Sequence, residues 1–530
     1  MTMNDEVIEV QGPVGRPDSI RQRLGNAAWG TGATAFVANG VPFSFTTGPE
    51  LAARVCDLTV FLAEARDESS VTLHDVGAGT GYLTRHVIEA LAERDPKLAR
   101  SCEYVASDNS QEMVSAMASV LTDLPLGLED RVSVRVGDAL SSEDILEGDP
   151  SIVLMSYLID AVPPQHVVRS EGTANEVLVQ TYVVADQPVV DGSTWPPRVL
   201  EGETLAEVLR SSPESLSPGA ILQVLPLIVE AALEGPALEN HDDAGSSAPF
   251  FNTRPDVVSS FTHTISQLRD ESILLVTDFG FSGSQVPDTL DVLMTEYGAA
   301  TCYAVFFNEL IAAATSVGTT CCVLPGGEGG THTLAIYKGS RTDAFQGMFE
   351  GTFGQADPDR ERTVAQTMTE VSSLEDAQAM ERDILATGQQ SYANSANLAH
   401  LFAAFGDVDT ARGYAAECDS RYGLIAAPEQ LLLGDLAVRS GDLDAAVKWY
   451  ERARETAPTY GATHVKVAEV YLDQERTSDY AEAMKAYIRV TDEPVWEHVE
   501  WMTAREVGSE VVPDAVWEEF QRICAAEFGG

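Results

Sequence analysis

The chain has 530 residues, 44% of them hydrophobic, which is enough for about two to four globular domains. Its 82 acidic residues outnumber the 33 basic ones and give a formal net charge of −49, so we expect no binding to nucleic acid or to anionic membranes. No run of about 18 residues is free of charge and proline, and the first residues lack the apolar segment of a secretion signal, which predicts a cytoplasmic protein without a membrane span.

The net charge bears on the expected partners, and the cysteines bear on metal binding and disulfides. A field of this sign would attract a basic peptide or protein, although a requirement for solubility alone also accounts for it. The seven cysteines are scattered and show neither Cys-x-x-Cys nor the Cys/His spacing of a zinc site. We therefore expect reduced thiols and no metal.

The first two thirds of the chain alternate between strand and helix patterns. Residues 1–70 hold a polar leader, a glycine-rich segment and a helix-like stretch. Residues 71–345 then alternate short β-branched runs with helical periodicity, which predicts a parallel sheet with crossover helices. The strand 272–281 is followed by two strands joined by a glycine-rich turn, which predicts an antiparallel hairpin at the sheet edge.

An insertion at about 185–270 interrupts this domain. The sequence predicts strands and turns over residues 176–198 and helices over residues 199–235. A polar, glycine-containing stretch at 239–249 predicts a surface loop.

The last third of the chain has a different composition. Strand signals vanish, and we expect a helical linker over residues 346–388 and an all-α domain over residues 389–530. Residues 431–458 place small and aromatic residues where two antiparallel helices must approach, and the pattern recurs before and after this unit, ending near Pro494. The spacing is similar to the tetratricopeptide repeat, with a plain helical bundle as the alternative. The positions that carry it best are Gly406, Asp407, Ala411, Gly434, Gly441, Asp442, Ala446, Tyr450, Ala453 and Pro458.

A glycine-rich turn follows the first strand of the predicted sheet. Residues 75–81 read Asp-x-Gly-x-Gly-x-Gly, and each glycine removes a side chain where the loop must lie flat against a ligand. A dinucleotide fingerprint would want its third glycine at position 82, where this chain has Tyr82, and the Gly-Lys-Ser/Thr of a P-loop is absent. The residues expected to contact a cofactor from this turn are Asp75, Gly77, Gly79 and Gly81.

Two further strand ends indicate which cofactor this is. Asp108 follows the second strand, where a carboxylate can accept hydrogen bonds from both ribose hydroxyls, and Asp138 with Ala139 follows the third, where it can meet an adenine amino group. A glycine turn without a phosphate-binding lysine suits an adenosine that carries an amino-acid carboxylate. Together these features describe S-adenosylmethionine (SAM), and we assign Ser156, at the end of the fourth strand, to the same site.

The cofactor motifs resemble those of class I SAM-dependent methyltransferases, in the family's order. A Rossmann-like domain that holds another nucleotide, or no ligand, is the alternative. Other stretches resemble the MidA-like family, which includes the mitochondrial complex I assembly factor that methylates a protein arginine. Residues 43–51 are similar to its Phe-x-Thr-x-Pro-Glu signature, residues 156–180 to its Asp-Ala-x-Pro stretch, and residues 272–281 to its Leu-Leu-x-Asp-Tyr-Gly strand. Residues shared with these patterns are Thr47, Pro49, Glu50, Asp160, Ala161, Pro163, Glu176 and Asp278.

Two acids of the MidA-like pattern are missing. Tyr157 replaces the second member of an Asn-Glu pair, and Thr253 lies near the position of another glutamate. An arginine acceptor needs carboxylates that hold and orient its guanidinium, so these departures bear on acceptor choice. Methyl transfer from a sulfonium is an in-line displacement, in which the protein positions the acceptor and takes a proton from it. Candidates for that role are Glu50, Asp160, His166 and Asp278, followed by His263; helix caps and surface positions are the alternatives.

The sequence therefore predicts an α/β protein. We expect a Rossmann-like seven-stranded methyltransferase sheet with an inserted segment, followed by a tetratricopeptide-like helical domain. The expected activity is methyl transfer from SAM to a peptide or protein, with a nitrogen such as that of arginine among the candidate acceptor atoms. The alternatives are a non-catalytic SAM-binding scaffold and a small-molecule N- or O-methyltransferase whose repeats serve a homodimer.

Overall fold

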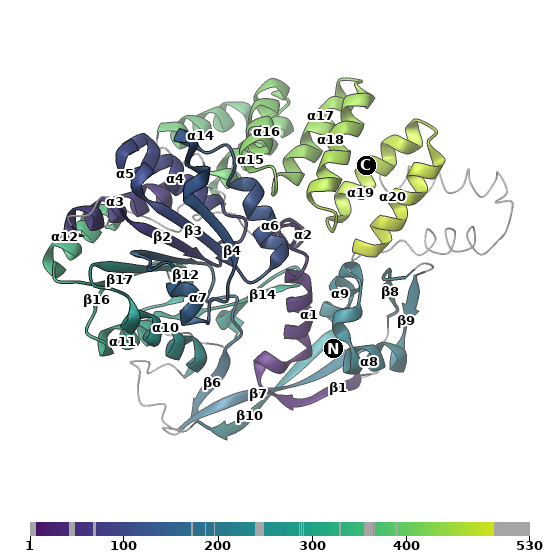
Figure 1. Ribbon diagram of the computed structural model, residues 1–530. Coiled ribbons are helices and arrows are strands. Elements are labelled where there is room, and N and C mark those ends of the chain that lie inside the picture. Colours follow the sequence, from purple (N-terminus) through teal and green to yellow (C-terminus); the bar gives the residue numbers. More distant parts are fainter. Residues whose placement is uncertain are drawn as a thin grey trace.

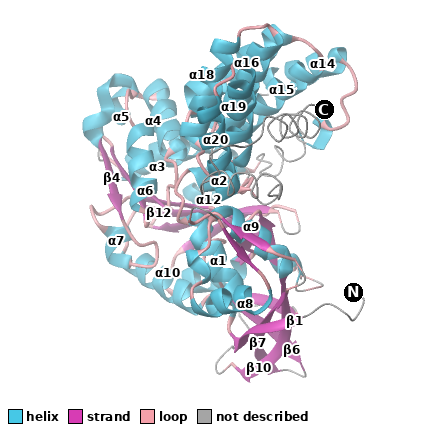
Figure 2. Cartoon of the chain, turned by 90° about the vertical axis from the view of Figure 1, so that its right-hand side faces the viewer, coloured by secondary structure: helices cyan, strands magenta, loops and turns pink. Residues whose placement is uncertain are grey.

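Three structural units are visible in the computed structural model: a main sheet with its helices, a second sheet, and a helical module (Figure 1). Figure 2 shows the helical module at one end of the molecule and the second sheet at the other. The structure describes residues 7–491 except 42–47, 67–69, 171–172, 186, 195–196, 239–248, 286, 288, 290, 328–329, 355–363, 365 and 387–390.

The main sheet has the strand order β16-β17-β12-β5-β2-β3-β4, and the short β15 pairs with the end of β12. The five strands from β12 to β4 are parallel, whereas β17 runs antiparallel between β12 and β16. The predicted parallel sheet and edge hairpin are therefore confirmed, with one strand more than expected. The strands are β2 (Thr72–Val76), β3 (Glu103–Asp108), β4 (Val132–Val136), β5 (Ile152–Ser156), β12 (Ser272–Phe281), β15 (Val305–Phe306), β16 (Thr320–Leu324) and β17 (Thr331–Lys338).

Helices cover both faces of the main sheet, which is why its central strands β5 and β12 are largely apolar and buried. On β12, Leu275 packs into one core and its neighbour Leu274 into the other, as the two-residue period of a strand requires. One face carries α3 (Pro49–Arg66), α4 (Tyr82–Arg94), α5 (Pro96–Ser101) and α12 (Thr342–Phe353). The other carries α7 (Ser142–Leu146), α10 (Pro255–Gln267) and α11 (Phe307–Ser316), and α6 (Gln111–Val120) connects β3 to β4.

The second sheet differs from the sequence prediction at two places. Residues 7–14, expected to belong to a polar leader, form strand β1 on β7. Residues 228–237, which include the end of the stretch 199–235 that was expected to be helical, form β10 on the other edge of β7. A short apolar run is compatible with either a strand or a helix. Here both segments became strands because each pairs with a free edge of the long strand β7. The sheet contains β1 (Val7–Val14), β6 (Gln165–Ser170), β7 (Thr173–Val184), β10 (Ile228–Ala237) and β11 (Phe250–Thr253).

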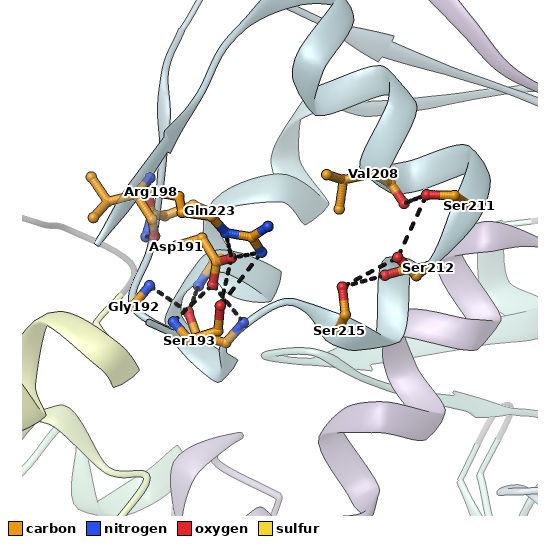
Figure 3. Close-up of polar contacts among 12 residues, drawn as sticks. Asp191, Gly192, Ser193, Arg198, Val208, Ser211, Ser212, Ser215 and Gln223 are labelled. Atoms are coloured by element: carbon orange, nitrogen blue, oxygen red, sulfur yellow. Dashed lines mark hydrogen bonds and ion pairs between the residues drawn. The ribbon is translucent and has the colours of Figure 1, made fainter. Parts of the chain in front are cut away.

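Smaller elements join the second sheet to the rest. The hairpin of β8 and β9 turns around the fully buried Asp191, whose carboxylate accepts hydrogen bonds from Ser193, Arg198 and the backbone of Ser217 (Figure 3). Gln223 connects this turn to the helical module, since its side-chain amide bonds to Val190 and donates to the Thr491 carbonyl. The remaining elements are α1 (Ile20–Trp29), α2 (Thr34–Ala38), β8 (Val189–Asp191), β9 (Arg198–Leu200), α8 (Gly202–Ser211), α9 (Pro218–Val224), β13 (Met294–Tyr297) and β14 (Ala300–Tyr303).

The helical module consists of successive helices joined by short loops. The repeated Gly-Asp pairs have a structural role: Gly406 and Gly441 adopt left-handed backbone conformations, and Asp407 and Asp442 then cap the next helices. The helices are α14 (Leu374–Ala386), α15 (Tyr392–Ala404), α16 (Val408–Tyr422), α17 (Ala427–Arg439), α18 (Leu443–Thr456), α19 (Gly461–Asp473) and α20 (Thr477–Val490). Thr47 and Pro494 lie outside the described residues, and none of the described helices has the length and apolar content to cross a bilayer.

Gly434 shows why the repeat pattern needs small residues. A Cβ at this position would lie 2.2 Å from Cε1 of Tyr450, because α17 and α18 cross here at close range. Tyr450 is buried and donates its hydroxyl proton to Asp435 at 2.6 Å. The ring therefore cannot move aside without losing both its packing and its hydrogen bond.

We predict that Gly434→Ala lowers the free energy of unfolding of the module by about 1–3 kcal/mol through overpacking. Gly413→Ala on α16 is the matched control, because its Cβ would meet no atom within 4 Å. This control should stabilise by about 0.5–1 kcal/mol, since alanine is the better helix former. Urea unfolding followed by circular dichroism measures both, and equal effects of the two variants would contradict the packing argument.

Candidate functional site

The candidate site lies at the carboxyl ends of β2, β3, β4, β5 and β12, where loops from neighbouring parallel strands converge. The turn after β2 contains Gly77, Gly79 and Gly81, all with positive φ. Its backbone is tied to β3, because the N–H of Ala78 donates to the Ser107 carbonyl at 2.9 Å. The turn is therefore a fixed feature of the sheet edge.

The three glycines have different surroundings. A Cβ at Gly77 would lie 2.5 Å from Leu158, and one at Gly81 would lie 2.6 Å from Met117, so the packing of the chain itself requires glycine at both positions. At Gly79 the nearest atom, Cζ of Phe36, is 3.5 Å away. Gly77 and Gly79 are both partly exposed, but only the Cβ position of Gly79 is free of close contacts among the three, so its side of the turn has room for a ligand.

Asp108 completes the turn from the end of β3. Its Oδ2 accepts the N–H of Gly79 at 3.1 Å, and its Oδ1 accepts the N–H of Ser110 at 3.0 Å. Each carboxylate oxygen keeps a second lone pair, so both can still accept from a ribose hydroxyl. Burial raises the pKa of this carboxyl, opposed by the backbone N–H groups that favour its charged form.

Asp75 lies behind the turn. It is buried and accepts the hydroxyl proton of Thr84 at 2.7 Å, which ties the first turn of α4 to β2. Burial raises its pKa from 3.8 to about 7. The adjacent His74 is also buried, between the Ile145 carbonyl and the Ser107 hydroxyl, and burial lowers its pKa to about 4. Both side chains support the turn from inside the protein.

The residues after β4 and β5 are more exposed. Asp138 is exposed, and its carboxylate accepts the N–H of Leu140 at 2.9 Å, whereas Ala139 and Ser156 are half-buried. Asp138 and Ala139 follow β4, which neighbours the β3 of Asp108, and Ser156 ends β5, which lies on the far side of β2. All of these predicted cofactor residues therefore lie at the same sheet edge, across four adjacent strands.

A buried carboxylate holds the loop after β5. Asp278, at the end of β12, accepts the N–H groups of Ile159 and Asp160 at 3.0 and 3.1 Å. Tyr157 lies in the same loop with a φ of 48°, which is strained for a non-glycine residue. The clamp directs Leu158 onto Gly77. Asp278 and Asp160 are both buried, and this burial raises the pKa of each carboxyl. Asp278 supports the loop through its two backbone hydrogen bonds, whereas Asp160 contributes its backbone N–H.

A buried arginine compensates these acids. The guanidinium of Arg254 donates to the carbonyls of Val162, Tyr303 and Ala304, and burial lowers its pKa to about 10. Glu309 on α11 lies nearby, is hydrogen-bonded to Thr253, and has its pKa raised by burial to about 7. Sequence reasoning missed both residues, because only the fold places them beside Asp160.

The other predicted proton acceptors lie apart from one another. Glu50 pairs with Arg54 one turn along α3, and Arg54 also donates to the Thr352 carbonyl. His166 is buried on β6 at 2.6 Å from Asn252, and burial lowers its pKa to about 4, while His263 is exposed on α10. Among the described residues there is no group of three or more His, Cys, Asp or Glu suited to a metal.

The helical module packs directly against the cofactor turn. Tyr82, the residue after Gly81, accepts the N–H of Leu424, and His86 on the next turn of α4 lies 3.2 Å from the Tyr422 hydroxyl. The rings of Tyr82 and Tyr422 meet edge to face at 5.2 Å. With the buried Tyr392 they form one apolar cluster between α4 and the α16–α17 loop.

These residues fit SAM: an approachable glycine turn, a carboxylate for the ribose, and further polar groups after β4 and β5. Residues 53–307 match the model of a family described as "Putative S-adenosyl-L-methionine-dependent methyltransferase". Over these residues the chain is a SAM-dependent methyltransferase. Its cofactor supplies a methyl group on a sulfonium, and Asp108 and the glycine turn would hold that cofactor. No curated protein matches this methyltransferase.

Several solved structures are distantly similar to the methyltransferase. A Burkholderia thailandensis protein bound to S-adenosyl-homocysteine is 15% identical with a TM-score of 0.42, covering 62% of this chain and 88% of that one. A native structure of a member of the same superfamily from the same organism is 14% identical with a TM-score of 0.41 and the same coverages. The mitomycin 7-O-methyltransferase MmcR is 15% identical with a TM-score of 0.26, covering 54% of each chain.

The Asp75 carboxyl predicts a pH dependence. The unfolded chain releases this proton near pH 3.8 and the folded chain near pH 7, so the folded state holds the extra proton between these values. The contribution of Asp75 to the free energy of unfolding therefore falls as pH rises from about 4 to about 7. Asp75→Asn has no proton to release, so its free energy of unfolding lacks this pH dependence. The difference in free energy of unfolding, variant minus wild type, should therefore be more positive at about pH 8 than at about pH 5. A pH-independent difference in urea unfolding would contradict the assignment.

The Asp108 geometry predicts a binding effect. Asp108→Ala should weaken S-adenosyl-homocysteine by about tenfold to a hundredfold, because it removes acceptors for the ribose and the support of Gly79. The affinity of Asp108→Asn for S-adenosyl-homocysteine should lie between that of the wild type and that of Asp108→Ala. Isothermal titration calorimetry measures the affinity, and Asp130→Ala, an exposed acid in the turn before β4, is the control that should bind as wild type does.

Proposed function

We propose that the methyltransferase transfers the methyl group of SAM to a polypeptide, and that the helical module helps to present that polypeptide. The observation that carries this proposal is the position of the module, whose α16–α17 loop packs on the first turn of α4, next to the cofactor turn. A segment bound on the module would thus lie close to the methyl group. Stacked helical hairpins are surfaces that commonly bind extended chains.

The charge of the protein supports a basic acceptor segment. A net charge of −49 attracts cationic segments over long range and raises their association rate. A nitrogen acceptor such as that of arginine or lysine agrees with this field. A protonated nitrogen must lose a proton before it can attack, and Glu309, which is partly exposed and whose pKa burial raises to about 7, is one carboxyl beside Arg254 that can exchange a proton near neutral pH.

The proposal is tested with SAM labelled on its methyl group and a size-fractionated lysate of the protein's own host. We expect label in a macromolecular fraction with the wild type and none with Gly79→Arg. The arginine side chain would occupy the space beside the turn in which we place the cofactor. Labelling should fall as salt is raised, because screening weakens attraction of a basic segment.

Two outcomes would contradict the polypeptide acceptor. Label confined to small molecules would indicate a metabolite acceptor and would leave the module a structural role. An absence of label in every fraction, with S-adenosyl-homocysteine still bound in calorimetry, would favour a SAM-binding scaffold. Asp130→Ala serves again as the control variant that should label as wild type does.

A further inference from the structure

We propose that residues 30–41 form a cover over the SAM site, that Phe36 contacts the bound cofactor, and that the helical module holds this cover in place through Val37. The inference concerns the cofactor side of the methyltransferase and does not depend on the polypeptide acceptor. It assigns a binding role to an N-terminal segment that the sequence motifs did not include.

The segment crosses the ends of β2 and β3. At its start, a Cβ on Gly32 would lie 3.1 Å from Cβ of Glu112, so the chain passes close to the start of α6, which follows the Asp108 loop. Four residues later, Phe36 places its ring over Gly79, with Cζ 3.5 Å from the Cβ position. The segment thus extends from the ribose side of the site to the glycine turn.

Phe36 is suited to contact a ligand. Its ring is only partly buried, and so is Gly79, so both border the space next to the turn. Trp29 meets the ring edge to face, with centroids 5.3 Å apart and an interplanar angle of 70°. This contact fixes the direction of the ring. An aromatic ring in this place can cover the apolar part of a cofactor and exclude water from its charged centre.

Both ends of α2 are attached to other units. Val37 packs against two apolar clusters built largely from the helical module. One contains Tyr450, and the other contains Tyr422 together with Tyr82 of α4. The Thr459 hydroxyl donates to the hydroxyl of Thr34 at 3.2 Å. At the other end, Asn39 is buried and accepts the N–H of Ala299 at 2.8 Å. Because α2 has five residues, its position depends on these attachments more than on its own helical stability.

The module therefore contacts the surroundings of the cofactor site at two places. It contacts the first turn of α4 through Tyr422 and it contacts the cover through Val37. Loss of the Val37 contact should loosen the cover while Phe36 and the glycine turn remain unchanged in sequence. The role of the module can therefore be tested by changing Val37 alone, with the helical module left in the protein.

The test is calorimetric titration of full-length variants with S-adenosyl-homocysteine. Phe36→Ala should raise Kd by about tenfold, since it removes one buried aromatic contact, and Phe36→Leu should recover most of the loss. Val37→Asp should raise Kd by about fivefold with Phe36 intact, because a carboxylate cannot stay in the apolar contact, and Val37→Leu should bind as wild type does. Val438→Ala, at an exposed position on α17, is the control.

Hydrogen exchange separates this role from a general loss of stability. In the wild type, S-adenosyl-homocysteine should protect the amides of residues 33–41, and Val37→Asp should lose that protection while the amides of β2 and β12 stay protected. An affinity of Phe36→Ala within twofold of wild type would overturn the contact with the cofactor. An unchanged affinity of Val37→Asp would overturn the role of the module, and a wild type that binds no S-adenosyl-homocysteine would overturn the cover and the cofactor assignment together.

Discussion

The carboxylate of Asp278 is buried at the end of β12, yet it accepts backbone N–H groups from Ile159, Asp160 and Phe279. A buried carboxylate without such partners would cost several kcal/mol, so the clamp forms only if the loop after β5 takes one conformation. That conformation places Leu158 against Gly77 and keeps Tyr157 at positive φ. The glycine turn, and with it the cofactor site, is therefore shaped by a residue far away in the sequence.

Charge compensation around this clamp explains several residues that look functional in isolation. Asp160, Asp278 and Arg254 are all buried, and the guanidinium of Arg254 satisfies three carbonyls of the surrounding loops. Their shifted pKa values result from burial and from one another. A carboxyl with a shifted pKa at a strand end is consequently weak evidence of proton transfer unless solvent or substrate can also contact it. Glu309 is partly exposed and meets this condition.

The helical module is an integral part of the fold. Its loops cover apolar residues of α4 and α6, namely Tyr82 and Val120, and Gly219 of α9 lies so close to the end of α20 that a Cβ would meet the Thr491 carbonyl at 2.3 Å. These contacts join the module to the main sheet on one side and to the second sheet on the other (Figures 1 and 2). The surroundings of the cofactor turn and the helical module thus share one set of packed side chains.

The amino-acid sequence by itself determined the features that depend on local periodicity and on short motifs. The alternation of strands and helices from residue 71, the edge hairpin and the glycine turn at 75–81 could be predicted, because each is encoded in a short stretch of chain. The repeat spacing also predicted that the helices carrying Gly434 and Tyr450 approach closely. Only the tertiary structure decided the rest. Strands β1 and β10 form because β7 offers them its edges, and the buried surroundings of Asp160 come from Asp278 and Arg254, which lie in distant segments of the chain. Burial and long-range pairing set these outcomes, and neither is a property of a single stretch of chain.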